Sequence, residues 1–265
     1  MPEKKNKNET KKSFKKKTRK DKKKDERVSV RTPFDKEAWK PKTEIGKKVK
    51  QGIIKNIDEL LDNCAQIKEA EIIDALVPDL EVELLFVGQA KGKFGGGQRR
   101  VFRQTQKKTS EGNKPSFATV AIVGNKDGFV GMGMGKAKET VPAREKAIRN
   151  AKLNIIKIRR GCGSWACGCK EPHSLPFNIN GKSGASELIF MPAPKGTGLV
   201  AEKECQKILK LAGISDVWSK KLRSGSTKLN IISSCFKALK KLMSMKVKQD
   251  LIEKVGIVEG AIKNE

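Results

Sequence analysis

The alternation of apolar and polar residues predicts a β-hairpin followed by a helix in the middle of the chain. Ala118 to Val123 is a short, β-branched apolar run, typical of a buried strand. Turn residues at 125–128 and a second strand from Phe129 follow. Thr140 then caps a helix that tolerates proline in its first turn. The predicted apolar stripe of this helix consists of Ala143, Ala147, Ala151 and Ile155.

The same reasoning extends along the rest of the chain. Strands are expected at 82–87, 101–106, 175–179, 187–191 and 214–218, with a polar turn at 107–115. Short helices are expected at 56–61 and 69–77, and longer ones from Leu199 to Gly213 and from about Lys228. The chain is therefore predicted to be α+β. The strands and helix of its first half are arranged as in a double-stranded-RNA-binding domain.

Composition and pattern together divide the chain into six segments. Residues 1–27 hold fourteen Lys or Arg against five acids and are expected to be a disordered basic tail. The other expected segments are an extension packed on the core or on partners (28–80), the double-stranded-RNA-binding-like domain (81–160), a Cys/His linker (161–173), an α/β domain (174–245) and a C-terminal tail (246–265).

Charge narrows the class of partner. The 265 residues include 58 Lys or Arg and 30 Asp or Glu, a net charge of +28. Such an excess indicates a polyanionic partner, and nucleic acid is favoured over a membrane, because no apolar run approaches the ~20 residues of a spanning helix. No apolar stretch follows the basic N-terminus, so no signal peptide is predicted. We therefore expect a reducing, cytoplasmic location.

The glycines that end the second strand are the first candidate for RNA binding. Gly131, Gly133 and Gly135 lack side chains, so either another backbone or a phosphate can come close to this strand. A glycine-rich strand end beside lysines and a helix start is a phosphate site in physical terms. The alternative is a hairpin packed on an amphipathic helix with solvated lysines. The predicted contacts in this first domain also include Lys136, Lys138, Arg144, Arg149, Arg159 and Arg160.

Basic loops supply the other candidate RNA contacts. The loop 88–100 combines a glycine run with positive charge, which suits a backbone that moulds to RNA, although a plain surface insertion remains an alternative. Its candidates are Lys91, Lys93, Arg99 and Arg100. Lys195, Lys220, Lys221 and Arg223 are the candidates in the second domain.

Enzyme functions that use these motifs are not supported by the spacing. A nucleotide P-loop requires glycine and Ser or Thr where Val130 and Ala137 stand. Lys136 and Lys138 break both registers of a dinucleotide fingerprint. One histidine and no clustered carboxylates leave no general base for a zinc-dependent hydrolase. We expect a non-enzyme.

The linker 161–173 is a candidate metal site. It contains half of the six cysteines and the single histidine: Cys162, Cys167, Cys169 and His173. Four N/S ligands suit a closed structural zinc site. The spacing C-x4-C-x-C-x3-H differs from paired C-x2-C knuckles, so reduced thiols in an RNA-facing loop are the alternative, with Trp165 stacked on a base or on the domain seam. Cys64, Cys205 and Cys235 are predicted to be small core residues.

Several long segments resemble a known family. The sequences GFVGMGMGKAKE, AREKAIRNAKLNIIKIRRGCGSW, PHSLPF, GKSGASELIFMPAPKGTGLV and AGISDVWSKKLRS are similar to the universal protein five family of the small ribosomal subunit, in its archaeal form. The similarity extends from about Trp39 to Leu242. The lysine-rich tail, the insertion at 88–100 and the lengthened 107–115 turn do not match.

The resemblance implies more than the residues alone. It implies a small C-terminal βαβα domain with a left-handed crossover after the double-stranded-RNA-binding-like domain. It also implies a structural constituent of the small ribosomal subunit that binds rRNA, contacts neighbouring ribosomal proteins and lies near the channel by which mRNA enters, where it supports assembly, decoding accuracy and translation. The alternative is a free-standing double-stranded-RNA-binding regulator or chaperone.

Overall fold

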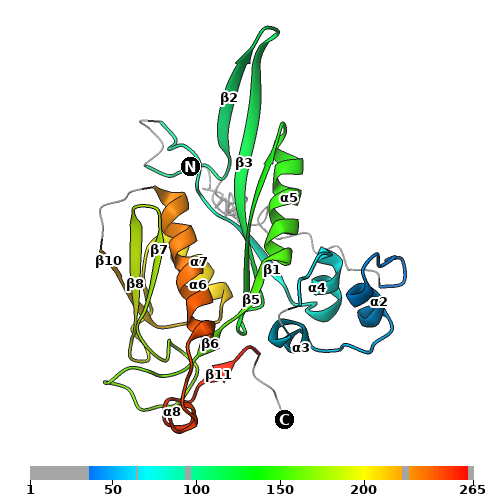
Figure 1. Cartoon of the computed structure of the whole chain (residues 1–265). Coiled ribbons are helices and arrows are strands. Elements are labelled where there is room, and N and C mark those ends of the chain that lie inside the picture. Colours follow the sequence, from blue (N-terminus) through cyan, green and yellow to red (C-terminus); the bar gives the residue numbers. More distant parts are fainter. Residues whose placement is uncertain (1–35, 64, 93–96, 223–226, 262–265) are drawn as a thin grey trace, which may run out of the picture. The chain divides into compact units, whose positions relative to one another are not determined.

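The structure is a computed structural model that describes residues 36–63, 65–92, 97–222 and 227–261, all within one compact unit, Phe34–Glu265. The predicted basic tail 1–27 lies outside these residues. Within them, two larger sheets each pack against helices (Figure 1), so the α+β prediction is confirmed. No helix of the described part is long and apolar enough to cross a membrane.

The first sheet contains the predicted hairpin. Its strands are β1 (Glu81–Leu84), β2 (Arg103–Thr109), β3 (Gly112–Gly124), β4 (Phe129–Ala137) and β5 (Ile155–Lys157), in the order β1-β3-β4-β5 with β2 also paired to β3. Every pairing is antiparallel. The turn between β3 and β4 is fixed by Asn125, whose Oδ1 accepts hydrogen bonds from the N–H groups of Asp127 (2.9 Å) and Phe129 (3.1 Å). Helix α5 (Thr140–Leu153) packs along β4.

The second sheet has the order β7-β8-β10-β9. It is built from β7 (Ile179–Ser183), β8 (Ser186–Pro192), β9 (Leu199–Val200) and β10 (Val217–Lys221). Only the β9–β10 pair is parallel, and helix α6 (Lys203–Leu211) connects these two strands. Helix α7 (Lys228–Ser244) packs on β7 and β8. Apolar side chains of this sheet and its helices share one buried cluster with Val120, Ile122 and Val130 of the first sheet.

Segments at both ends of the described chain pack on this framework. Helices α2 (Glu44–Lys50), α3 (Ile57–Asp62) and α4 (Ala70–Leu76) precede β1, and buried Ile73 of α4 belongs to the same cluster as Ala147 and Ala151 of α5. After α7 come α8 (Gln249–Val255) and β11 (Val258–Glu259), which pairs with β6 (Arg159–Arg160). The predicted C-terminal tail therefore includes an ordered segment that returns to the end of the first domain.

Several local predictions are wrong. The strand predicted at 175–179 is β7, which begins at Ile179, and the N-cap of α5 is Glu139 where Thr140 was predicted. Residues 107–115, predicted to be a polar turn, form the paired ends of β2 and β3. The sequence did not indicate strands here because both faces of this ribbon are exposed and carry no apolar alternation. Ile155 lies in β5 opposite Gly131, since α5 ends before Asn154. The helix predicted from Leu199 is α6, which starts at Lys203, because Leu199–Val200 form strand β9. The strand predicted at 214–218 is β10, which begins at Val217.

Candidate nucleic-acid interface and candidate metal centre

The three β4 glycines contact a helix. A Cβ atom on Gly131 would lie 2.2 Å from the carbonyl oxygen of Ala151, and a Cβ atom on Gly135 would lie 2.2 Å from that of Ala143. All three glycines are buried under α5. The sequence allowed either another backbone or a phosphate to come close to these glycines. In the structure it is the backbone of α5 that lies against them. A phosphate cannot reach these glycines from the side covered by the helix.

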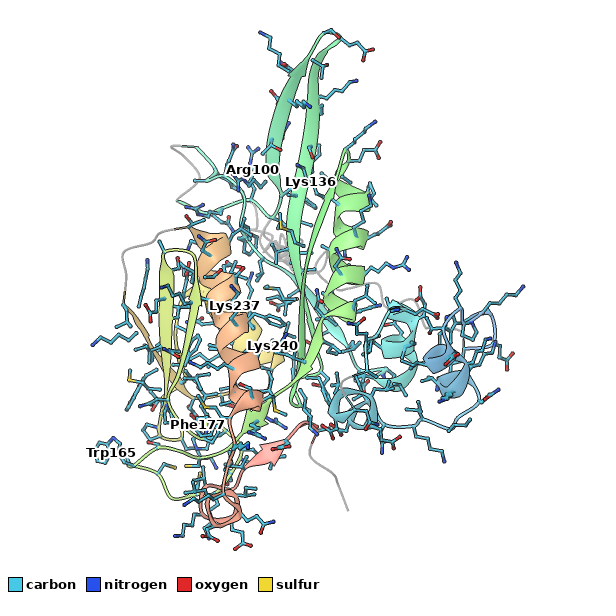
Figure 2. The ribbon with its side chains drawn as sticks, in the orientation of Figure 1. Arg100, Lys136, Trp165, Phe177, Lys237 and Lys240 are labelled. Carbon is cyan, nitrogen blue, oxygen red and sulfur yellow. The ribbon has the colours of Figure 1, made fainter. Side chains whose placement is uncertain are left out.

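The charged residues around the glycines are exposed. Lys136 projects from the end of strand β4 and Lys138 from the connection to α5, while Arg144 and Arg149 lie on the outer face of the helix. Figure 2 shows Lys136 beside the start of the projecting β2–β3 ribbon. Helix α5 begins with Glu139 as its N-cap and without a side-chain capping bond. Four of the predicted RNA contacts are thus accessible in this fold, and their contact with RNA stays a prediction.

The loop 88–100 is a small hairpin where it is described. The N–H of Gly88 donates to Arg100 O (2.8 Å) and the N–H of Lys91 to Gln98 O (2.9 Å). Lys91 and Arg100 are exposed, and Arg99 is half-buried. Lys93 lies outside the described residues. The base of this loop is therefore ordered, with two basic side chains facing solvent.

The β2–β3 ribbon is a basic surface that sequence reasoning missed. Figure 1 shows it extending beyond the other strands of its sheet. Its exposed side chains include Arg103, Lys107, Lys108 and Lys114. The sequence offers only Gly112 between two polar runs as a signal. In the structure its φ of +113°, in the region that favours glycine, lies at the tip of the ribbon. Because the ribbon carries cations on an otherwise unpacked element, it belongs among the candidate RNA contacts.

The guanidinium groups of Arg159 and Arg160 form hydrogen bonds with other groups of the protein. Arg160 is 4% exposed, and its Nη2 donates to Asp127 Oδ1 (2.5 Å) and Gly260 O (3.0 Å). Arg159 Nε donates to Glu259 Oε1 (2.6 Å), and its Nη1 donates to Met245 O. Both guanidinium groups hold the returning C-terminal segment in place, and contact of these two arginines with RNA stays a prediction.

The candidates of the second domain are exposed lysines. Lys220 and Lys221 lie at the end of β10, and Lys195 lies in the loop between β8 and β9. Lys195 Nζ is 2.6 Å from Glu171 Oε2, an ion pair that raises the pKa of the lysine and lowers that of the carboxyl. Arg223 lies outside the described residues.

The linker gathers all four predicted metal ligands. The Sγ atoms of Cys162, Cys167 and Cys169 and a ring nitrogen of His173 all lie within 4.8 Å of one another. His173 Nε2 is 3.9 Å from Cys167 Sγ. A tetrahedral zinc ion with Zn–S bonds of about 2.3 Å separates its ligand atoms by about 3.6–3.8 Å. The cluster could therefore hold a metal ion with small side-chain adjustments.

The surroundings shift the pKa values of two of the thiols in opposite directions. The N–H groups of Lys195 and Cys169 hydrogen-bond the sulfur of Cys167 and lower its pKa to about 6. Burial and the neighbouring thiols raise the pKa of Cys162 to about 11. A divalent cation between these sulfurs would stabilise every thiolate at once. Cys205 and Cys235 are buried in the main core as predicted, and Cys64 lies outside the described residues.

Trp165 is presented by the same linker. It lies between the candidate ligands Cys162 and Cys167 and is 92% exposed. Figure 2 shows its side chain at the edge of the protein, pointing away from the helices and strands. It does not occupy a seam between the domains, and stacking on a base stays open.

Comparison with known proteins defines the class. Residues 101–159 match the family described as "Ribosomal protein S5, N-terminal domain". Residues 181–253 match "Ribosomal protein S5, C-terminal domain". Both descriptions are of ribosomal-protein domains, and together they include β2 to β5, α5 and the helices and sheet of the second half.

Three relatives extend the match over most of the chain. Each has the name "Small ribosomal subunit protein uS5". The relative from Nanoarchaeum equitans is 50% identical over 229 residues, 86% of this chain and 98% of its own. The relative from Methanocaldococcus jannaschii is 45% identical over 86% of this chain and 99% of its own, and that from Pyrobaculum aerophilum 45% over 80% and 91%. The chain belongs to the ribosomal protein S5 family.

Proposed function

We propose that this protein is a structural constituent of the small ribosomal subunit, in the cytoplasm, and that it binds rRNA without catalysing a reaction. The observation that carries the proposal is the 50% identity to a small-subunit protein over 98% of that protein's length. The +28 net charge and the exposed lysines and arginines around β4 and α5 support it. Neighbouring small-subunit proteins are its other partners.

Binding is electrostatic in this proposal. Each phosphate contact releases condensed counterions, so affinity falls steeply as salt rises. The contacts are assigned to the exposed basic residues of the first domain, the 88–100 loop and the β2–β3 ribbon, with Lys195, Lys220 and Lys221 in the second domain. The boundaries 81–160 and 174–245 for the two domains, and a position near the channel by which mRNA enters, belong to the same proposal.

Sedimentation tests the assignment. In a gradient of cell lysate, the protein should co-migrate with the small subunit at about one copy per subunit. A population that stays at the top of the gradient would favour the alternative, a free-standing double-stranded-RNA binder. An rRNA crosslink map of the same fractions should place crosslinks on the β4–α5 connection.

A variant pair tests the surface. Replacing Lys136 and Lys138 with Ala should lower the slope of log affinity against log salt by about one to two, since each lost phosphate contact contributes about 0.9. Replacing Lys47 and Lys48, two exposed lysines of α2, is the matched control with the same loss of charge. Equal changes in both variants would mean that only net charge matters, and would contradict the assigned surface.

We further propose that the Cys/His cluster holds a structural Zn²⁺. Three sulfurs and one imidazole nitrogen fill a tetrahedral shell and leave no open position, as in closed structural sites. Purified protein without a histidine tag should contain about one zinc per chain. The Cys167→Ser/Cys169→Ser double variant should contain none, whereas Cys205→Ala, which alters a buried core thiol, should retain the metal. Metal-free wild-type protein under reducing conditions would contradict the site.

A further inference from the structure

Asp216 connects the Cys/His cluster to the second domain. Its carboxylate is almost fully buried, and the two oxygens have different partners: Oδ2 lies 2.9 Å from His173 Nδ1, and Oδ1 accepts a hydrogen bond from the N–H of Gly198 (2.7 Å). Its backbone N–H donates to His173 O (3.1 Å). A buried carboxylate is tolerated only where such bonds replace water. Asp216 is therefore fixed between the linker and the 194–198 loop.

The contact with Asp216 determines which nitrogen of His173 faces the cluster. With Nδ1–H donated to a carboxylate, the neutral ring keeps a lone pair on Nε2, the atom 3.9 Å from Cys167 Sγ. Metal-binding histidines commonly use this carboxylate–histidine arrangement, which orients the ring and strengthens it as a ligand. The alternative, a buried ion pair between a protonated His173 and Asp216, would explain only the 2.9 Å contact. It would not explain three thiols gathered on the other side of the ring.

The 194–198 loop is tied to the same cluster by a second route. The N–H of Lys195 hydrogen-bonds the sulfur of Cys167. Within the loop, Thr197 Oγ1 donates to Pro194 O (2.8 Å). Gly196 and Gly198 have φ values of +91° and +74°, so the loop is built on residues that lose much backbone entropy on ordering. A loop of this kind requires anchors, and two of those anchors end on candidate ligands: Lys195 on Cys167, and Gly198 through Asp216 on His173.

We propose that Asp216 is a positioning residue of the zinc centre: one oxygen holds His173 toward the metal and the other holds the 194–198 loop, so that zinc binding and ordering of this basic loop are coupled. This inference rests on the proposed zinc. It assigns the metal the role of joining the linker to a loop of the second domain that carries Lys195, one of the predicted RNA contacts. Loss of the metal should then loosen a surface loop while the hydrophobic core stays folded.

Zn²⁺ affinity in a double-mutant cycle tests the positioning role. Asp216→Asn retains the size of the side chain but supplies one acceptor oxygen where two are needed, and should weaken Zn²⁺ binding about 10- to 100-fold in a chelator competition. His173→Cys creates a four-sulfur site that does not use Asp216. Adding Asp216→Asn to His173→Cys should therefore cost little further affinity. Co²⁺ absorption of each variant reports the number of thiolate ligands.

The outcomes separate the two proposals. If wild-type protein fails to bind Zn²⁺ or Co²⁺, the zinc centre itself is wrong. If it binds Zn²⁺ and Asp216→Asn binds equally well, the zinc centre stands and the positioning role is overturned. An equal loss of affinity in the wild-type and His173→Cys backgrounds would mean that Asp216 supports only the fold, which also overturns it.

Amide hydrogen exchange tests the coupling to the loop. In the full chain, the amides of Lys195 and Gly198 should exchange more slowly with Zn²⁺ bound than after treatment with a chelator. The amides of Ile189 and Phe190 in β8, which pair with β7 and β10, are the internal control and should not change. Equal exchange of the two loop amides in both states would overturn the coupling even if zinc is bound.

Discussion

Gly133 of β4 and Ala151 of α5 are so close that a Cβ atom on Gly133 would lie 2.1 Å from the backbone nitrogen of Ala151. The contact is between backbones, so a new side chain there cannot be accommodated by a rotamer change. It explains why the glycines of β4 face the alanines of α5: the strand side of this interface has no Cβ atoms, and the helix side has only methyl groups. The packing of the first domain depends on this approach.

Gly133→Ala should therefore destabilise the fold. Overpacking in a core typically costs 1–3 kcal/mol, and a backbone clash should reach about 3 kcal/mol. Chemical denaturation followed by circular dichroism measures the change. Gly92→Ala is the control, because a Cβ atom at Gly92 meets nothing within 4 Å. A stable Gly133→Ala protein with weakened RNA binding would instead favour a direct phosphate contact at this position.

Arg160 should matter for stability and not for RNA. Asp127→Ala removes the carboxylate 2.5 Å from its guanidinium and leaves the buried cation with Gly260 O. We expect a loss of about 2 kcal/mol, below the 3–5 kcal/mol of a fully buried pair because Asp127 is partly exposed. Arg160→Gln should leave the salt slope of RNA binding unchanged in the folded fraction, whereas Arg149→Gln, on the exposed face of α5, should lower it. A lower slope for Arg160→Gln would contradict its structural role.

The β3–β4 hairpin and α5 could be predicted from the sequence because apolar periodicity, turn residues and helix length agreed over residues 118–153. The β2–β3 ribbon could not, since Lys107, Lys108 and Lys114 face solvent and no periodicity distinguishes an exposed ribbon from a loop. The four metal ligands lie within twelve residues and could be predicted as a group. Asp216 is 43 residues from His173, so its contact depends on the tertiary fold.

Arg159 and Arg160 show the limit of reasoning from charge. Two adjacent arginines after a basic helix have the composition of an RNA contact. Their partners, Glu259 and the carbonyl of Gly260, lie 100 residues away in a segment without a strong pattern. Composition indicates that a surface is cationic overall. Which cations are neutralised inside the protein depends on packing.

Glu69 should make the stability of the N-terminal extension depend on pH. Its Oε1 accepts hydrogen bonds from the N–H groups of Lys42 (2.8 Å) and Thr43 (2.5 Å). Burial alone would raise the pKa of this carboxyl, but the bonds from Thr43 and Lys42 outweigh burial and lower it. A pKa lowered by folding gives stability that is present above the unfolded pKa of about 4.3 and is lost as the pH falls through the folded value.

Glu69→Gln should therefore cost about 2 kcal/mol at pH 7 and progressively less toward pH 3, as the wild-type carboxyl becomes protonated. Denaturation of both proteins at the two pH values measures the difference. Glu71→Gln, which neutralises another acid of the same segment, is the control for net charge. A penalty for Glu69→Gln that stays constant between pH 7 and pH 3 would show that the two hydrogen bonds do not require the charge.

Cys167 should be the most reactive thiol of the linker when the metal is removed. Its pKa of about 6 makes it largely thiolate at pH 7, whereas Cys162, with a pKa of about 11, stays protonated there. Alkylation by iodoacetamide in the presence of a chelator, read out by peptide mass spectrometry, should rise through about pH 6 at Cys167 and remain slow at Cys162. Zn²⁺ should protect Cys167, because a thiolate bound to the ion is a poorer nucleophile. Alkylation that rises only near pH 8.5, as for an ordinary thiol, would show that the N–H groups of Lys195 and Cys169 do not stabilise this thiolate.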